Sequence, residues 1–147
     1  MALLAEDAAD RAAQLLLLTE RLGVLVVAET QTLAAGQPLA GDGGDGAELR
    51  RLANAYRLEM ARIRADANLI APAPRPLRER LQAATEQLQG QLETFNNALS
   101  AAREITEGLV RAVAEEVQRA RKGPAGYDAQ GGYADASTLP VALDQRA

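Results

Sequence analysis

The sequence contains no cysteine and no histidine among its 147 residues. Without cysteine the chain can form no disulfide, thiolate nucleophile or zinc finger. Without histidine it lacks the commonest general base. A Mg²⁺ or Ca²⁺ site built from carboxylates alone would need acidic residues clustered in a loop, whereas these lie at helical spacing. We therefore predict no catalytic, cofactor or metal site and a protein that is not an enzyme; the lack of cysteine also fits a cytoplasmic location.

Aromatic residues are almost as scarce, with no tryptophan, one phenylalanine and three tyrosines. The hydrophobic residues still make up 48% of the chain, and they are mainly alanine, leucine and valine. Alanine and leucine lose little side-chain entropy in a helix, so they favour helical structure. The composition therefore predicts an almost entirely helical protein.

The sequence also lacks a basic segment and a long uninterrupted apolar run. Its net charge of -4 is spread nearly evenly, without the basic excess that binding to duplex DNA requires. The most apolar stretch, QLLLLTERLGVLVVAET, is interrupted by Thr19, Glu20 and Arg21. A helix that spans a membrane needs about 20 nearly uncharged apolar residues. We expect no nucleic-acid partner and no membrane insertion.

Glycine and proline divide the chain. They concentrate in AAGQPLAGDGGDG at 34–46, in APAPRP at 71–76 and in KGPAG at 122–126, and such clusters interrupt helices. Because GDGGDG lacks both a phosphate-loop lysine and spaced calcium ligands, a flexible linker is the favoured interpretation. Three helical stretches remain: about 5–35, 46–71 and 76–122.

These limits predict an all-α fold, a three-helix antiparallel bundle with a long C-terminal helix. Residues 1–122 form a single helical domain in this interpretation, and residues 123–147 form a flexible tail. Asp45 followed by Glu48 resembles a capping box that would open the second helix. The first helix is apolar nearly all round, so it is either the most buried helix or contacts a partner with a second face.

The third helix is expected to be too long for the other two to cover. At 1.5 Å per residue the three helices measure about 46, 39 and 70 Å, which leaves about 20 Å or more of the third exposed. Exposed apolar residues in such a segment usually mark a site for a partner helix or for a second copy. Periodicity alone does not separate these two possibilities. The segment carries Ile105, Leu109, Val110, Val113 and Val117.

The tail is the other feature that asks for an explanation. GYDAQGGY places Tyr127 and Tyr133, two of only four aromatic residues, after the last helix. They could fold back onto the bundle, or they could anchor a short docking segment. The stretch TLPVALDQRA offers a further small apolar element of the same type.

The segment FNNALSAAREITEGLVRAVAEEVQRARKGPAGYDAQGG resembles the C-terminal half of the FlgN-type flagellar export chaperones. That family has a long final helix with Asn positions and evenly spaced aliphatic residues, followed by a Tyr-Gly-Pro-Asp-Gly tail. The matching tail here is Tyr127-Asp128-Ala129-Gln130-Gly131, so Asp-Ala-Gln replaces Gly-Pro-Asp. The alanine- and arginine-rich composition resembles that of an alphaproteobacterial, FlbY-like branch of the family.

The resemblance implies a cytoplasmic chaperone of the type III export system. Such chaperones bind the C-terminal segments of hook–filament junction proteins of the FlgK/FlgL type and present them to the export apparatus. Arg103, Glu104, Glu107 and Arg111 would frame the surface that binds these exported subunits. The family's surface for them maps onto Ile105, Leu109, Val113 and Val117, with Val110 beside them.

The resemblance also implies a role for the tail, because the family's tail tyrosine is associated with docking at the export gate. Tyr127 occupies that place, and Tyr133 is assigned the same role. The alternative is a homo-oligomeric coiled-coil protein with a structural or regulatory role in flagellar biogenesis. It predicts a homodimer through the first or third helix.

Overall fold

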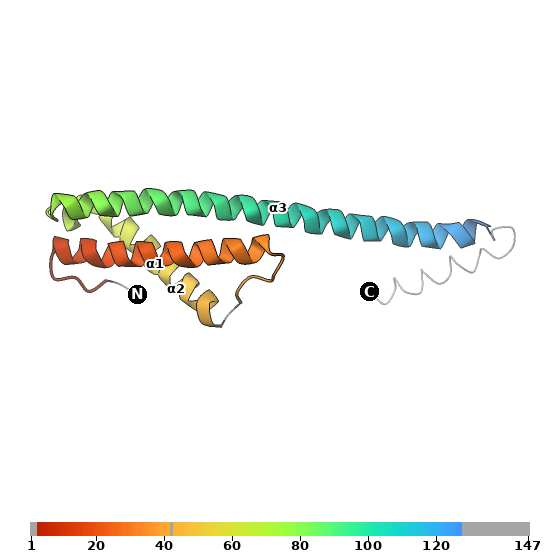
Figure 1. Cartoon of the computed structure of the whole chain (residues 1–147), viewed down its shortest axis with the longest axis horizontal. Coiled ribbons are helices and arrows are strands. Elements are labelled where there is room, and N and C mark those ends of the chain that lie inside the picture. The colour runs from red at the N-terminus through yellow and green to blue at the C-terminus, as the bar shows by residue number, and fades with distance from the viewer. Residues whose placement is uncertain (1–2, 42, 128–147) are drawn as a thin grey trace. The chain divides into compact units, whose positions relative to one another are not determined.

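The computed structural model describes residues 3–41 and 43–127, and the side chains of these residues as far as Lys122. These residues contain no strand, which confirms the predicted all-α class (Figure 1). The elements in chain order are α1 (Ala8–Ala34), α2 (Gly44–Ala65), the 3₁₀ helix η1 (Ala67–Leu69) and α3 (Arg75–Tyr127).

The contacts within the chain separate two compact units. The first is Met1–Ala102 and the second is Arg103–Ala147, so α3 contributes to both. The predicted limits of a helical domain at 1–122 and a tail at 123–147 stay a prediction, and residues 128–147 lie outside the described part of the chain.

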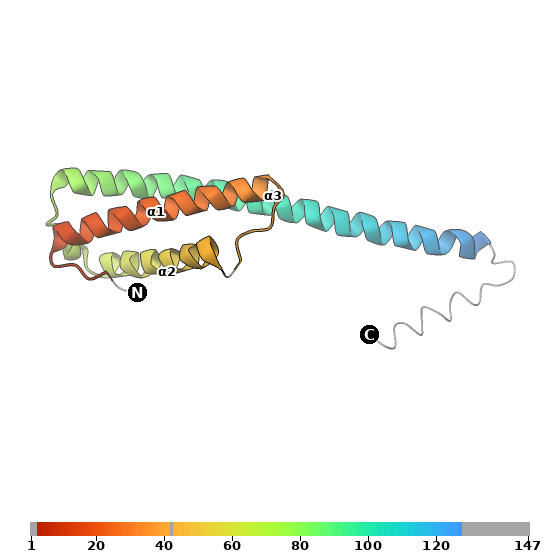
Figure 2. The same cartoon turned by 60° about the horizontal axis from the view of Figure 1, so that its bottom comes forward.

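The first unit is a three-helix bundle, as the sequence predicts. Figures 1 and 2 show α1 and the beginning of α3 side by side and running in the same direction. In both views α2 runs back against them, so the path is up, down and up. The antiparallel neighbours are thus the consecutive helices, and α1 and α3 are parallel.

The core of this bundle comes mainly from α1, which agrees with the first of the two alternatives predicted for this helix. Ala55 from α2, Ala73 before α3 and the leucines Leu81 and Leu88 from α3 complete it. Burying a leucine side chain stabilises a fold by roughly 1.5–3 kcal/mol, so this helix dominates the apolar free energy of folding. The apolar residues of α1 that are buried are Ala12, Leu15, Leu16, Leu18, Leu22, Leu25 and Val26.

The first helix begins three residues later than predicted, at Ala8. The Asp7 carboxylate accepts a hydrogen bond from the backbone N–H of Asp10, at 2.8 Å. Asp7 has an extended backbone and so acts as the N-cap. An N-cap satisfies a backbone donor that the first turn leaves unpaired, and the residues before it are not helical.

The predicted capping box at the start of the second helix is wrong. The N-cap of α2 is Gly43, and no side chain caps the helix. The Glu48 carboxylate instead accepts two hydrogen bonds from Arg21 on α1, both 2.8 Å long. This forked contact holds the pKa of Glu48 below its usual value. Glu48 therefore forms an ion pair with another helix and does not cap the first turn of its own helix.

The observed C-terminal ends of the second and third helices differ from the predicted ones. The second helix ends at Ala65, not 71, because Asp66 adopts an extended backbone and its carboxylate accepts from the N–H of Asn68, at 3.0 Å. The third helix continues to Tyr127, past the predicted end at 122. Pro124 lies in the last turn of this helix, where it removes one backbone hydrogen bond and ends the helix within three residues.

The linker between α1 and α2 is held at its centre. The buried Glu29 carboxylate accepts a hydrogen bond from the backbone N–H of Ala40, at 3.3 Å. Gly46 packs so closely here that a Cβ atom would lie 2.0 Å from the carbonyl oxygen of Gly41. A side chain at position 46 would therefore displace the linker.

A buried carboxylate joins three segments at the other end of the bundle. Glu59 on α2 has a fully buried side chain. Its Oε2 accepts from Arg11 of α1 at 2.7 Å, and its Oε1 accepts from Arg62 at 2.8 Å. The backbone N–H of Leu3 also donates to Oε1, at 3.3 Å. This network fixes α1, α2 and the N-terminal segment to one another.

Replacing Glu59 by glutamine should destabilise the bundle by about 3 kcal/mol, because the mostly buried charge of Arg11 would lose its ion-pair partner. Urea unfolding followed by circular dichroism measures this loss. Glu79→Gln is the matched control, since it removes the same charge from the exposed Arg75–Glu79 pair. The control should cost no more than about 0.5 kcal/mol, and equal losses in both variants would contradict the role given to Glu59.

Candidate partner-binding site

The aliphatic residues assigned to a partner site are all exposed in the second unit. They lie on α3 at steps of one, three or four residues, which places them along one side of a helix. We call this set the apolar stripe. The exposed fractions of its residues are 72% for Ile105, 64% for Leu109, 63% for Val110, 55% for Val113 and 49% for Val117.

The stripe continues the apolar periodicity of α3, whose earlier members are buried in the bundle core. In the first unit, Leu81 and Leu88 follow that periodicity and are buried against α1 and α2. From Ile105 onward the same type of residue is exposed. A contiguous apolar surface on a monomer indicates a site that another surface covers. The helix is therefore a packing element in one unit and a potential docking element in the other.

The charges around the stripe are not arranged as the sequence suggested. In a helix with 3.6 residues per turn, Arg103 lies on the same side as Val110, seven residues later, and Glu107 lies one turn before Val110. Glu104 and Arg111 fall on the side away from the stripe by the same geometry. Only two of the four charged residues expected to frame the site therefore border it.

An ion pair lies at the C-terminal margin of the stripe. The Glu116 carboxylate accepts a hydrogen bond from Arg119, and both side chains are exposed. Glu116 follows Val113 by three residues and precedes Val117 directly. Beyond it, Arg121 and Lys122 are exposed, so the helix carries a basic end next to the apolar residues.

The two tyrosines assigned to docking remain predictions. Tyr127 is the last residue of α3, but its side chain lies outside the described residues. Tyr133 lies outside them entirely. Neither role is tested by the structure.

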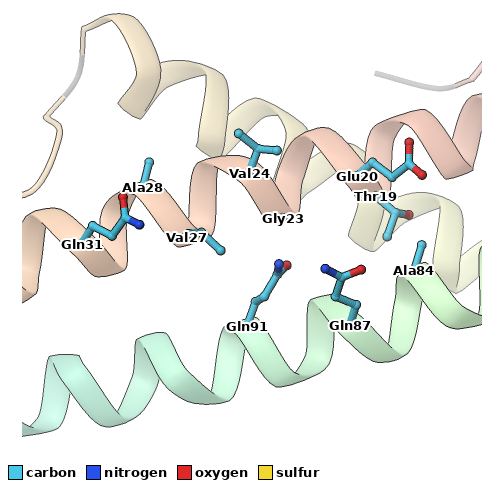
Figure 3. Close-up of a pocket in the computed structure, with 10 residues that line it drawn as sticks. All are labelled: Thr19, Glu20, Gly23, Val24, Val27, Ala28, Gln31, Ala84, Gln87 and Gln91. Carbon is cyan, nitrogen blue, oxygen red and sulfur yellow. The ribbon is translucent and has the colours of Figure 1, made fainter.

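A second surface, which the sequence did not single out as a site, lies between α1 and α3 in the first unit. Figure 3 shows Gln87 and Gln91 extending from α3 toward α1. They line a hollow of about 470 Å³ together with Gly23, Val24 and other residues of α1. A Cβ at position 23 would lie 2.5 Å from the Oε1 atom of Gln91, so a side chain there would require the flexible end of Gln91 to move. The sequence feature that could have indicated this hollow is the pair Gln87 and Gln91, four residues apart on one helix, together with Gly23 on another.

The exposed apolar residues of α1 lie near this hollow. Val24 lines it with 59% of the residue exposed, and Leu17 is 66% exposed one heptad earlier. Apart from Glu20, the lining residues are uncharged. The first helix thus has both properties that its apolar circumference suggested, a buried face and an exposed apolar one.

Neither a metal cluster nor a membrane-spanning helix is found among the described residues. Among them, no group of three or more histidine, cysteine, aspartate or glutamate residues is placed to hold a metal ion. No helix in this part of the chain is long and apolar enough to cross a membrane.

Comparison with known proteins identifies a relative of this chain. It is 41% identical over 133 residues to the flagellar basal-body protein FlbY of Caulobacter vibrioides, across 90% of this chain and 88% of that protein. No protein-family model matches the chain, and no solved structure matches it. The identity confirms the predicted flagellar relationship and supports a role in flagellar biogenesis. The narrower FlgN-type assignment stays a prediction.

An identity of this size over most of both sequences indicates common descent and a common fold. The chain therefore belongs to the family of the flagellar basal-body protein FlbY.

Proposed function

We propose that this protein is a cytoplasmic flagellar export chaperone that acts by binding, not by catalysis. Its partners in this proposal are the C-terminal segments of hook–filament junction proteins, which it delivers to the type III export apparatus. The observation that carries the proposal is the apolar stripe, five exposed aliphatic residues on one side of α3. The relationship to FlbY and the resemblance of the C-terminal half to the FlgN-type chaperones supply the flagellar context.

The proposed mechanism is capture of one amphipathic helix by another. An exported subunit's helix would lay its apolar side along Leu109, Val113 and Val117, which are adjacent on α3. Bound in this way, the helix is unavailable for assembly. Arg103 and Glu107 border the stripe and would set the register of the bound helix through charge. The affinity should be moderate, because the exported subunit must be released.

The tail supplies the second step in this proposal. Tyr127 and Tyr133 would anchor the protein at the export gate, since aromatic side chains bury large rigid surfaces at interfaces. The stripe and the tail would then divide the work between holding the exported subunit and docking at the gate.

A homo-oligomer is the second candidate, and the exposed face of α1 favours it. Leu17 and Val24 are large apolar residues with more than half of their surface exposed. A second copy could cover them, and it could equally pair through the stripe. In this case the protein would be a structural or regulatory component of flagellar biogenesis without a specific exported partner.

Val113→Asp should weaken binding of the junction-protein segments at least about tenfold, because a buried carboxylate without a counter-charge is costly. Far-UV circular dichroism should show unchanged helicity, since Val113 is exposed in the free protein. Calorimetric titration with the C-terminal segments from the same organism measures the affinity. Gln118→Asp adds the same charge on the far side of the helix and is the matched control.

These two variants also separate the candidate functions. Equal affinity of both variants for the segments would sink the assignment of the stripe. No binding by the native chain, together with a stable dimer in sedimentation, would favour the homo-oligomer. Unfolding of Val113→Asp would show that this residue belongs to a core.

Tyr127→Ala should leave the affinity for the junction-protein segments unchanged while lowering the amount of these subunits exported by cells. The reason is that residue 127 lies ten residues beyond the end of the stripe. Tyr127→Phe keeps the aromatic ring and should retain most of the export. A loss of segment affinity in Tyr127→Ala would refute the proposed division of labour.

A further inference from the structure

The apolar stripe is followed closely by a segment of the same chain that could cover it. The sequence after Tyr127 contains one aliphatic block, Leu139-Pro140-Val141-Ala142-Leu143, inside the stretch TLPVALDQRA. We propose that this block, residues 139–143, docks on the apolar stripe of its own chain and covers it until a partner helix displaces it.

The connecting chain is long enough for this contact. The stripe residues Ile105 and Val117 precede Tyr127 by 22 and 10 residues. At 1.5 Å per residue they lie roughly 33 and 15 Å from it along the helix axis. The eleven residues 128–138 reach up to about 36 Å when extended. The block can therefore arrive at any position on the stripe.

The charges favour the same arrangement. The described end of α3 carries the exposed Arg121 and Lys122, which follow the Glu116–Arg119 ion pair. The segment 128–147 carries three aspartates against one arginine, a net charge of -2. Opposite charges a few ångströms apart attract even at physiological salt, where screening acts over about 8 Å. The basic end would hold the acidic segment close to the stripe.

The attachment of the block to the same chain distinguishes it from other occupants. A segment joined by a short connection has an effective concentration in the millimolar range at its target. A second copy of the chain is present at its actual concentration, which is far lower in a dilute solution. At equal contact quality, the chain's own segment therefore occupies the stripe first.

The consequence for regulation rests on the proposed function, whereas the contact itself does not. A partner helix and residues 139–143 would exclude each other from one surface. If the segment covers the stripe nine tenths of the time, the partner's apparent affinity falls about tenfold. Binding of the partner would release the segment, and with it Tyr133 would become available for docking. Only the loaded protein would then present its tail.

The contact is tested with a spin label, which the lack of native cysteine makes simple. A nitroxide attached to Ser137→Cys should broaden the backbone amide signals of residues 105–117 in the ¹⁵N-labelled full chain. Reduction of the nitroxide with ascorbate gives the reference spectrum. The additional exchange Leu139→Glu with Leu143→Glu should abolish this broadening, because it removes the apolar block.

The matched control is Gln130→Glu with Gln145→Glu, which adds the same two charges outside the block and should retain the broadening. A second sample mixes chains that carry the nitroxide but no ¹⁵N with ¹⁵N-labelled chains that carry no nitroxide. This mixture should show no broadening. Broadening in that mixture would assign the stripe to a second copy and overturn the proposal. Broadening absent from residues 105–117, or equal in both double variants, would overturn it too.

Adding a junction-protein C-terminal segment then separates this inference from the proposed function. Loss of the broadening on titration supports both. Broadening that persists at saturating segment concentration leaves the contact established and refutes the stripe as the binding site for exported subunits.

Discussion

Burial of α1 is the constraint on which the rest of the bundle depends. Most of the buried apolar side chains of the first unit belong to this helix, while α2 and α3 contribute few each. A helix that is apolar nearly all round must be covered on several sides. In this fold α2 covers one side of α1 and the first part of α3 covers another. The side of α1 that carries Leu17 and Val24 stays exposed. Apolar burial has no direction, so polar contacts fix how these helices meet.

Two polar devices provide that specificity. Glu59 ties α2 to Arg11 of α1 inside the bundle, where both of its oxygens are hydrogen-bonded. The Arg21–Glu48 fork joins the same two helices nearer the surface. A buried carboxylate without partners would be strongly unfavourable, so Glu59 tolerates few alternative alignments. These two charge pairs connect α1 to α2 at two levels of the bundle and favour the observed register.

The functional proposal follows from the way one helix serves two environments. In the first unit α3 buries Leu81 and Leu88, and in the second it exposes an apolar stripe of the same periodicity. A surface of this kind favours association with another amphipathic helix, whatever its source. The family relationship to FlbY supplies the flagellar context of the proposal. Competition between the chain's own segment and a partner would then make binding conditional.

The sequence by itself determined the helical class, the order of three helices and the identity of the exposed aliphatic residues, because composition and a 3.6-residue period are local properties. It could not determine the ends of α2, since Glu48 pairs with a residue 27 positions away and Asp66 caps a following turn. It also did not identify Glu59 or the Gln91–Gly23 approach as special. Only the tertiary structure decided these, because a side chain's partner across the bundle depends on how helices pack, and residue spacing along one helix carries no such information.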